Sequence, residues 1–419
     1  MITVEEARER VLQNFRRLEP EERPLLEALG QVTTEDVRAG FDIPPLDNTA
    51  MDGYAVRAAD TDGASESSPV ELRVIGELAA GYLFDGEVVP GTVVRIMTGA
   101  PLPAGADSIV PFEETDETGR GVPSKVGHTE SRVRIFKAAR PGNNIRRAGE
   151  DVRGGDVVVP AGTLLRPAHI GVLASLGHPT VRVTRRPLVA ILSTGDEVLE
   201  PGQPRGPGQI YDSNASSIAA MVLRNGGIPL RLGIARDTVE DLTAKVREAM
   251  QADMLVTTAG VSRGDFDVVK EVLAREGRID FWTVNMRPGK PLAFGVFENG
   301  GKRVPHIGLP GNPVSSMVTF ELFGRPALQT MLGRPVRERP IVRAITRDRI
   351  RMSDERRFFA RCLVTREGEG YLASLSGSQG SGVLTSMARG NGLAVIPEGS
   401  PDVQPGSEVE VLMLDWETD

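Results

Sequence analysis

The sequence predicts a multidomain protein that combines a three-layer α/β domain with β-rich domains and a small C-terminal β domain. Its 419 residues suffice for two to four domains of ordinary size. Residues 187–332 alternate short apolar strands with amphipathic helices, a pattern typical of a mainly parallel sheet covered by helices. Residues 40–160 and the stretch after 340 instead carry short β-branched runs between Gly/Pro turns, which indicates small β units.

The N-terminal part reads as helices followed by short strands. Apolar residues at helical spacing predict an amphipathic helix over 3–18, opened by a capping box of Thr3 and Glu6. A second helix is expected over about 21–30, ending at Gly30. Residues 167–181 read as a helix ended by Gly177 and followed by a strand. We expect one discontinuous domain and one insertion, with the bounds 1–40 plus 140–182, and 41–139.

The α/β domain is expected over 183–333. "PLVAIL" (187–192), "IPLRLGIA" (228–235) and "DMLVTTAG" (253–260) read as strands. Helices are expected after Asp212 or Ser213 with a stop at Gly226, over 238–251, and over "VVKEVLARE". Two strands should bracket "RPGK", and a strand, a loop and a helix should follow from His306. Residues 333–340 read as a linker, and 334–419 as the C-terminal β domain.

Composition excludes several classes of protein. A net charge of −8 argues against a nucleic-acid partner, which usually meets a basic face. The single cysteine, Cys362, allows no internal disulfide and fits a reducing compartment, and with four scattered histidines it forms no zinc pattern. No apolar run approaches a membrane span, and the charged start is no secretory signal. We therefore expect a cytoplasmic protein with no membrane partner.

Four glycine-containing loops follow apolar strands of the α/β domain. At the carboxyl ends of strands in an open α/β sheet such loops converge on one crevice. In "LPGNP", Asn312 suits a helix cap and Pro313 the first helical position, so the amides that follow, with Ser315 and Ser316, could bind an anion. The ordinary alternative is a plain strand-to-helix turn.

Charged residues in these loops point to a phosphorylated ligand. Arg287 and Lys290 flank a stiff turn and suit an oxyanion, although a solvated β-turn is the simpler reading of that motif alone. Carboxylates at the same edge, Asp196-Glu197 and Asp265 with Asp267, suit Mg²⁺ beside a phosphate, or else serve as helix caps. No "GxxxxGK[ST]", "GxGxxG" or "GxSxG" motif is present.

The stretch "DNTAMDGYAV" (47–56) places Asp47 and Asp52 in a loop stiffened by Pro44-Pro45. For Asp47 an Asx-type turn is the favoured interpretation over direct catalysis.

Seven motifs together resemble a known family. "DNTAMDGYAV", "RIMTGAPLP", "GEDV", "STGDEV", "GVSRGDFD", "RPGKP" and "LPGNPVS" occur in the order found in the molybdopterin molybdenumtransferases, which are homologous to the C-terminal domain of gephyrin. The resemblance implies an enzyme that inserts molybdate into adenylylated molybdopterin, with release of AMP and formation of molybdenum cofactor. It also implies Mg²⁺ as cofactor, a homodimer of elongated four-part subunits, and a molybdopterin adenylyltransferase acting upstream.

The resemblance carries functional residues onto matching positions. Catalytic positions are implied for Asp52, Thr98, Asp151, Glu197, Asp237 and Asp267, of which Glu197 and Asp267 would hold the metal. Substrate-binding positions are implied for Ser193, Thr194, Gly195, Gly260, Ser262, Gly264, Arg287, Lys290, Pro310, Gly311, Asn312, Pro313, Ser315, Arg361 and Ser381.

Two positions depart from the family pattern. Arg287 stands where the family usually has lysine, which keeps the charge but changes its geometry. Ala259 stands where the family has glycine, and its Cβ restricts the backbone. Two other classes remain open: a non-catalytic gephyrin-like scaffold, and a molybdopterin carrier. The carboxylates and cations retained at the motif positions argue against a scaffold.

Overall fold

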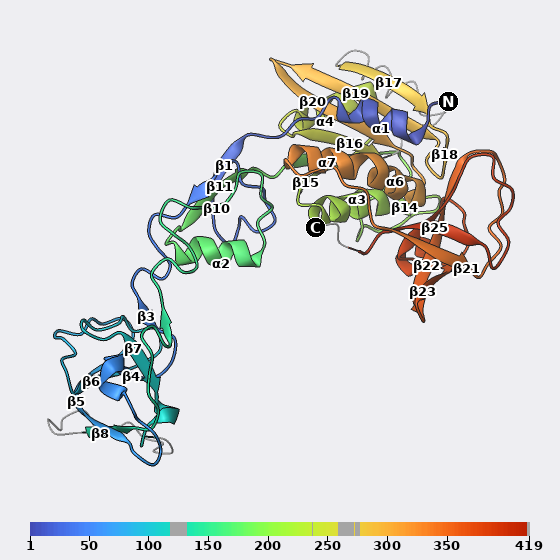
Figure 1. Ribbon diagram of the computed structural model, residues 1–419. Coiled ribbons are helices and arrows are strands. Elements are labelled where there is room, and N and C mark those ends of the chain that lie inside the picture. The colour runs from blue at the N-terminus through green and yellow to red at the C-terminus, as the bar shows by residue number, and fades with distance from the viewer. Residues whose placement is uncertain (118–131, 237, 259–271, 273–276, 417–419) are drawn as a thin grey trace. The chain divides into compact units, whose positions relative to one another are not determined.

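The computed structural model describes residues 1–117, 132–236, 238–258, 272 and 277–416 (Figure 1). The chain forms two compact units. The first, here the α/β unit, comprises Met1–Thr34, Gly162–Pro167 and Thr180–Asp419, and the second, here the β unit, comprises Glu35–Ala161 and Ala168–Pro179.

A six-stranded sheet forms the centre of the α/β unit. Its first four strands run parallel, and the last two are antiparallel to their neighbours. This arrangement confirms the mainly parallel sheet predicted from the alternating strands and helices. In spatial order the strands are β15 (Ile228–Ala235), β12 (Leu188–Thr194), β16 (Met254–Thr258), β20 (Lys302–Leu309), β19 (Pro291–Asn299) and β17 (Gly277–Thr283).

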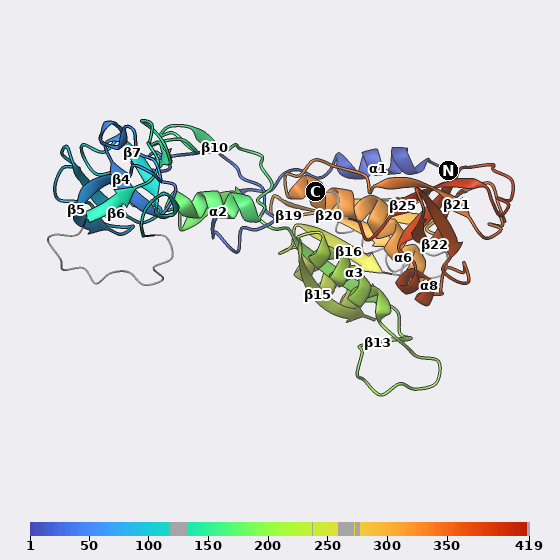
Figure 2. The same cartoon turned by 60° about the horizontal axis from the view of Figure 1, so that its bottom comes forward.

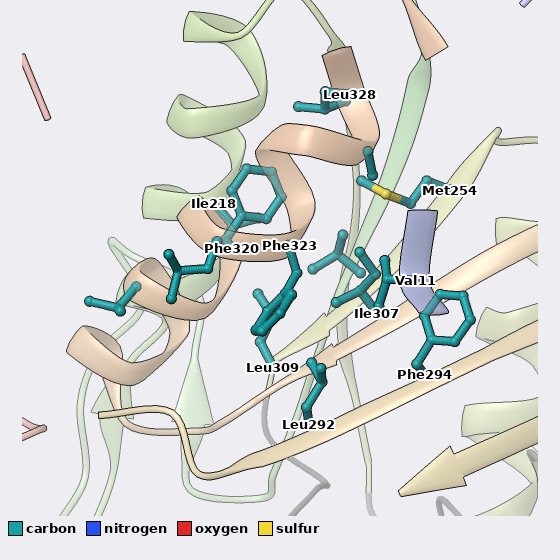
Figure 3. Packing of buried hydrophobic residues seen from close by; sticks show 14 of the residues in the cluster. Val11, Ile218, Met254, Leu292, Phe294, Ile307, Leu309, Phe320, Phe323 and Leu328 are labelled. Carbon is teal, nitrogen blue, oxygen red and sulfur yellow. The ribbon is translucent and has the colours of Figure 1, made fainter. Parts of the chain in front are cut away.

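Helices cover both faces of this sheet, so the domain has three layers. Along β12, Val189 and Ile191 join one core while Ala190 and Leu192 join the other, because successive side chains alternate between faces. Figure 3 shows Phe320 and Phe323 among the packed residues of the first core, which also contains Leu309 and Ile218. The first core includes side chains of α1 (Val4–Leu12), α3 (Ser213–Arg224), α6 (Pro313–Thr319), the π-helical turn Phe320–Gly324 and α7 (Arg325–Met331), and the second includes α4 (Val239–Ala249).

The C-terminal β domain of the α/β unit is a closed barrel. β22 pairs with both β23 and β24, and the remaining pairings complete the ring. The two-residue strand β18 (Met286–Arg287) pairs with β22 outside this ring, and Figure 2 shows the barrel beside α6. The barrel strands are β21 (Ile341–Thr346), β22 (Arg357–Glu367), β23 (Gly370–Leu375), β24 (Gly392–Ile396) and β25 (Glu408–Met413), and the short helix α8 (Thr385–Arg389) precedes β24.

The β unit is built on a five-stranded sheet with a core on each face. Tyr54 and Val56 join one core and Ala55 the other. In spatial order its strands are β7 (Ser108–Pro111), β4 (Gly53–Val56), β6 (Thr92–Ile96), β5 (Val70–Leu78) and β8 (Arg132–Ile135). The unit also contains 3₁₀ turns at Ala58–Thr61 and Phe112–Glu114, the pair β3 (Asn48–Thr49) and β9 (Ile145–Arg146), the pair β2 (Val37–Arg38) and β10 (Val157–Val159), and most of α2 (Pro167–Ser175).

Two predicted elements near the N-terminus differ from the structure. The helix expected over 21–30 is wrong: Pro20–Pro24 forms strand β1, which among the described strands pairs with β11 (Thr180–Thr184) alone. Prolines at both ends of this segment lack the N–H that a helix needs but fit a strand with a single partner. The helix predicted over 3–18 has its capping box, yet α1 ends at Leu12, and Leu18 N–H instead donates to Met331 O.

Other predicted elements are confirmed. α2 is followed by Gly177 with a φ of +79° and then by β11. α3 begins after Asp212 and is followed by Gly226 with a φ of +89°. Strand β14 (Ile210–Tyr211), paired with β13 (Val198–Leu199), leads into α3. In the described part of the chain, no helix has the length and apolarity required to span a membrane.

Candidate active site

A pocket of about 450 Å³ in the α/β unit gathers residues from four separate segments of the chain. We call it the basic pocket, because Arg287, Lys290 and Arg356 all line it. Seven residues predicted from the sequence as substrate-binding lie together here, although up to 94 positions separate them in the chain (381 − 287). They are Arg287, Lys290, Pro310, Gly311, Asn312, Ser315 and Ser381.

The "RPGK" turn carries two of the cations. Arg287 lies on β18, its guanidinium donates to Ser353 Oγ and stands 4.7 Å from the centre of the Phe358 ring. Lys290 is exposed, and among the described residues no acceptor contacts its ammonium. Arginine is thus held in place while lysine is left for a ligand.

Gly289 is required by the geometry of this turn. Its φ is +101°, and a Cβ there would lie 2.6 Å from Thr319 Oγ1 and 2.7 Å from Met286 Cε. The turn therefore packs directly against helix α6, and this contact fixes the position of Lys290 relative to Ser315.

The "LPGNP" loop starts α6 as the sequence predicts, with Asn312 at the cap and Pro313 at the first position. Two details differ. The Asn312 side chain makes no capping hydrogen bond, and the Val314 N–H donates to Ser381 O at 3.0 Å, so that amide is already used. Ser381 lies in a loop of the C-terminal β domain, so a carbonyl of that domain satisfies the Val314 N–H at the start of α6. Ser316 does not line the pocket and its N–H donates to Asn312 O, so the Ser315 amide and hydroxyl remain of the groups expected to meet an anion.

Arg361 lies behind the pocket wall. It is 1% exposed and does not line the pocket. Its Nη2 donates to Ser378 O and Gly380 O at 3.2 and 3.0 Å, and its Nη1 has no partner among the described residues. Burial, with repulsion from Arg287, lowers the pKa of Arg361 to about 10. The structure thus gives Arg361 contact with the loop that bears Ser381.

Two polar side chains of the lining were missed by sequence reasoning. Arg356 is paired with Asp354, with Nη2 to Oδ2 at 2.6 Å, and this bond lowers the pKa of Asp354 to about 2. Gln379 bonds both backbone groups of Arg361, at 2.8 Å from the N–H and 3.1 Å to the carbonyl. Neither position carries a local motif. Arg356 directly precedes β22, and Gln379 lies in the loop after β23, held to β22 through its bonds with Arg361.

A second pocket, of about 370 Å³, lies against the first. We call it the carboxylate pocket, because Glu197 and Asp212 line it. The two pockets share Gly311 and Asn312. Predicted residues in its lining are Ser193, Thr194, Glu197, Gly311, Asn312 and Pro313.

Gly195 does not line this pocket but positions Glu197. Its φ is +130°, and a Cβ there would lie 2.5 Å from the Glu197 carboxylate. Nearby, the hydroxyls of Ser193 and Thr258 are 2.8 Å apart. The tight turn after β12 therefore brings a carboxylate and two hydroxyls to one edge of the sheet.

Unpartnered oxygens in the carboxylate pocket fit a hard cation. Asp212 Oδ1 caps α3 by accepting from Ala215 N–H at 2.9 Å, while its buried Oδ2 has no partner among the described residues. Asn214 donates to Gly311 O at 2.7 Å and likewise leaves Oδ1 buried without a described partner. Together with Glu197 they supply oxygen atoms, the ligand type that Mg²⁺ prefers. The described residues contain no group of three or more His, Cys, Asp or Glu placed for a metal.

Five predicted site residues lie outside the described residues, and so does Ala259. They are Asp237, Gly260, Ser262, Gly264 and Asp267.

The β unit brings together Asp52 and Thr98. Asp52 Oδ1 accepts from both the N–H and the hydroxyl of Thr98, each at 2.7 Å. These bonds hold the pKa of Asp52 below its usual value. Asp151 lies on another loop, where its N–H donates to Ile43 O.

The Asx-turn expectation for Asp47 is wrong. Its carboxylate accepts from Ala148 N–H at 2.8 Å and pairs with Arg147 at 2.5 Å, so it ties together loops 100 residues apart. Its role in the described structure is to join two loops.

Three family models match consecutive parts of the chain. They are the MoeA N-terminal region (domain I and II) over residues 2–177, the "Probable molybdopterin binding domain" over 190–330, and the MoeA C-terminal region (domain IV) over 343–414. Molybdopterin molybdenumtransferase 2 of Mycobacterium tuberculosis is 38% identical over 98% of this chain and 99% of its own.

The chain belongs to the molybdopterin molybdenumtransferase family. It is therefore a transferase of molybdenum cofactor biosynthesis. The family's enzyme from Bacillus subtilis is 35% identical over 99% of this chain and 94% of its own. Among solved structures, a molybdopterin biosynthesis protein from Pyrococcus horikosii is 33% identical, with a TM-score of 0.81 and full coverage of both chains.

Proposed function

We propose that the protein inserts molybdate into adenylylated molybdopterin, with cleavage of the phosphoanhydride, release of AMP and formation of molybdenum cofactor. The observation that carries this proposal is the shared wall of the two pockets, Gly311 and Asn312. An oxyanion in the basic pocket and a phosphorylated pterin in the carboxylate pocket would then lie next to each other. Holding two reactants in contact is itself a large catalytic effect.

The basic pocket suits molybdate, a tetrahedral dianion. Lys290 supplies a point charge and Arg287 a planar fork, and the hydroxyls of Ser315 and Ser381 supply neutral donors. Because the whole protein carries a net charge of −8, long-range attraction does not favour a dianion, and the local cations must select it.

The carboxylate pocket suits the adenylylated substrate. Ile210 and Tyr211 are exposed in its lining and can pack against a heterocycle, while Ser193 and Thr258 offer hydroxyls to phosphate oxygens. A bound Mg²⁺ would neutralise charge on the phosphoanhydride, and Glu197, Asp212 and Asn214 would hold it, with Asp267 as a further predicted ligand. Water and substrate oxygens would complete its coordination.

We also propose that the active enzyme is a two-fold homodimer, supplied with substrate by a molybdopterin adenylyltransferase. Asp52 and Thr98 belong to a compact unit different from the one that holds both pockets. In a shared site, Asp52 of the partner subunit would face the phosphoanhydride. The exposure of the Asp52 carboxylate supports such a role.

The deciding experiment measures AMP release from adenylylated molybdopterin with and without molybdate. We expect release to depend on molybdate and to fall when molybdate is omitted. A scaffold would bind neither substrate, and a carrier would retain molybdopterin without releasing AMP. Either result contradicts the proposed reaction.

A further inference from the structure

We infer that Arg356 is a third cation of the oxyanion site, and that Asp354 is its fixed counter-ion, which holds Arg356 in place and weakens the binding of anions. The inference rests on the proposed function, in which the basic pocket takes the oxyanion. Arg356 lines that pocket together with Arg287 and Lys290, whereas Asp354 does not. The carboxylate therefore contacts Arg356 from outside the pocket lining.

Asp354 binds the guanidinium of Arg356 through both of its oxygens. Arg356 Nε donates to Asp354 Oδ1 at 2.9 Å and Nη2 donates to Oδ2 at 2.6 Å, while the Arg356 backbone N–H donates to Oδ1 at 3.0 Å. Such a paired contact fixes the plane of a guanidinium as well as its place. Arg356 is therefore positioned before any ligand arrives.

The guanidinium of Arg356 still keeps donors for a ligand. Its Nη1 donates to Met286 O at 3.3 Å, and its Nη2 donates to Asp354. Because each terminal nitrogen of arginine carries two N–H groups, Nη1 and Nη2 each keep one that no described residue accepts. A pair of N–H groups on one guanidinium suits two oxygens of a tetrahedral anion.

Asp354 also reaches Arg287, through Ser353. Arg287 donates to Ser353 Oγ, and Ser353 Oγ donates to Asp354 Oδ2 at 3.4 Å. The hydrogen bond from Arg356 lowers the pKa of Asp354 to about 2, and the charge of Arg287 adds to this effect. Asp354 is therefore ionised at neutral pH, with its charge beside two of the cations that line the basic pocket.

This negative charge opposes an anion bound in the basic pocket. Coulomb repulsion is proportional to the charge of the ligand, so Asp354 opposes a dianion about twice as strongly as a monoanion. Tight binding of a reactant before the reaction does not by itself speed the chemical step. A fixed counter-ion thus keeps Arg356 in place in the empty pocket and prevents the pocket from retaining its oxyanion too tightly.

A purely structural role for Asp354 predicts the opposite result. If the carboxylate only tied down the turn before β22, its loss would loosen Arg356 and weaken anion binding. The two roles therefore differ in the sign of the effect of Asp354→Asn. The amide oxygen of asparagine still accepts hydrogen bonds from Arg356, so this substitution removes the charge and keeps part of the positioning.

Calorimetric titration with molybdate, in the absence of any pterin, tests the inference. Lys290→Ala identifies the binding event of the basic pocket as the one that it weakens. We expect Asp354→Asn to tighten that event about 10-fold, as for removal of one nearby like charge. Competition with sulfate and perchlorate, at constant ionic strength, separates charge from shape. Sulfate, a dianion, should gain about 10-fold and perchlorate, a monoanion, about 3-fold.

Asp402→Asn is the matched control. Asp402 is 27% exposed and Asp354 32%, and Asp402 likewise pairs with an arginine, Arg349, at 2.7 Å. It also accepts from Met352 N–H at 2.8 Å and so holds the same turn, but neither Asp402 nor Arg349 lines the basic pocket. Asp402→Asn should therefore leave molybdate binding nearly unchanged.

Arg356→Gln tests the other half of the inference. This variant should weaken molybdate binding about 10- to 100-fold, as for loss of one charge-assisted hydrogen bond to an oxyanion. If it binds molybdate as the parent does, Arg356 is no part of the oxyanion site. Thermal melts check folding, and Asp354→Ser, which removes the same charge, replaces Asp354→Asn should the latter fail to fold.

The remaining outcomes are distinguishable. If the parent binds molybdate and Asp354→Asn weakens that binding or leaves it unchanged, Asp354 is a structural residue and the inference is wrong, while the proposed function stands. Equal gains for sulfate and perchlorate, or an equal gain in Asp402→Asn, contradict the counter-ion in the same way. If the parent binds no molybdate that depends on Lys290, the proposed oxyanion site itself is wrong, and the inference falls with it.

Discussion

Asp52 and Thr98 lie 46 residues apart in the chain, yet both donors of Thr98 converge on a single oxygen of the Asp52 carboxylate at 2.7 Å. The other oxygen, Oδ2, has no partner among the described residues. Thr98 thus fixes the orientation of the carboxylate and keeps it ionised, while one oxygen stays available to a ligand.

Asp52→Asn should abolish molybdate-dependent AMP release with near-normal folding. The amide oxygen can still accept both bonds from Thr98, so the loop should keep its shape while the charge is lost. Single-turnover AMP release checks the activity and a thermal melt checks the fold. Asp47→Asn is a suitable comparison, because it removes a carboxylate from the same motif that is already paired with Arg147. If Asp52→Asn turns over at the parent rate, the charge of Asp52 has no role in the reaction.

Thr98→Val should shift the pH dependence of activity. The Thr98 hydrogen bonds lower the pKa of Asp52 in the folded protein. This stabilisation is present above the unfolded pKa of ~3.9 and is lost as the pH falls through the lowered folded pKa. In Thr98→Val the hydroxyl donor is gone, so the pKa should rise and the acid limb of the pH–rate profile should move to higher pH. A ¹³C NMR titration of the Asp52 carboxyl provides a direct readout, and an unchanged midpoint would contradict this assignment.

Lys290→Ala should raise the molybdate concentration needed for half-maximal turnover by about 10- to 100-fold, as expected for one charge-assisted hydrogen bond to an oxyanion. Dependence on the adenylylated pterin should change less, since that substrate has other contacts. The measurement is a molybdate titration at saturating pterin substrate, with sulfate as a competing dianion. Lys302→Ala is the control, because this lysine lies at the start of β20, outside the basic pocket. An unchanged molybdate dependence would shift attention to Arg287 and Arg356.

Gly289→Ala should both destabilise the protein and weaken molybdate use. The new Cβ would clash with Thr319 Oγ1 and Met286 Cε at a backbone φ that disfavours any side chain. Overpacking of this kind costs about 1–3 kcal/mol. Gly301→Ala separates the two causes, because its φ of +83° is similar but a Cβ there meets nothing within 4 Å. Equal losses in both variants would mean that contact with α6 is unimportant.

The proposed homodimer predicts that activity and assembly are lost together. Sedimentation velocity should show a dimer at assay concentrations. Mixing Asp52→Asn with Lys290→Ala subunits should restore part of the activity, since one hybrid site would then be intact. A stable monomer with full activity would rule out the shared site.

The grouping of the basic pocket could be predicted because "LPGNP" follows β20 and "RPGK" follows β17. These two strands run in the same direction, so their carboxyl ends lie at the same edge of the sheet. Arg287, Lys290 and Ser315 were found by that rule together with the resemblance of their motifs. Arg356 could not be found, since no motif marks it and its place depends on how β22 pairs with β18. Asp212 was not predicted as a site residue for another reason. The sequence explains it as the cap of α3, and only the structure shows that its Oδ2 has no partner among the described residues.

Predictions from neighbouring residues also failed where a contact with a residue distant in the sequence determines the local structure. The segment at 20–30 has the composition of a short helix, but β11 offers a pairing edge more than 150 residues away. Fewer free amides follow Pro313 than expected for the same reason. The carbonyl of Ser381, in the C-terminal β domain, accepts a hydrogen bond from Val314 N–H. Both errors come from contacts that no window of neighbouring residues contains.

The pairing of β18 with β22 means that the proposed oxyanion site is built from two domains, the central sheet and the barrel. One end of the "RPGK" turn continues into β19 of the central sheet, and the other end is fastened to the barrel. A chain cut before Ile341 would lose the strand that pairs with Arg287 and the loop whose Ser381 carbonyl accepts from Val314 N–H. In the proposed reaction, selection of the oxyanion would therefore depend on both domains together.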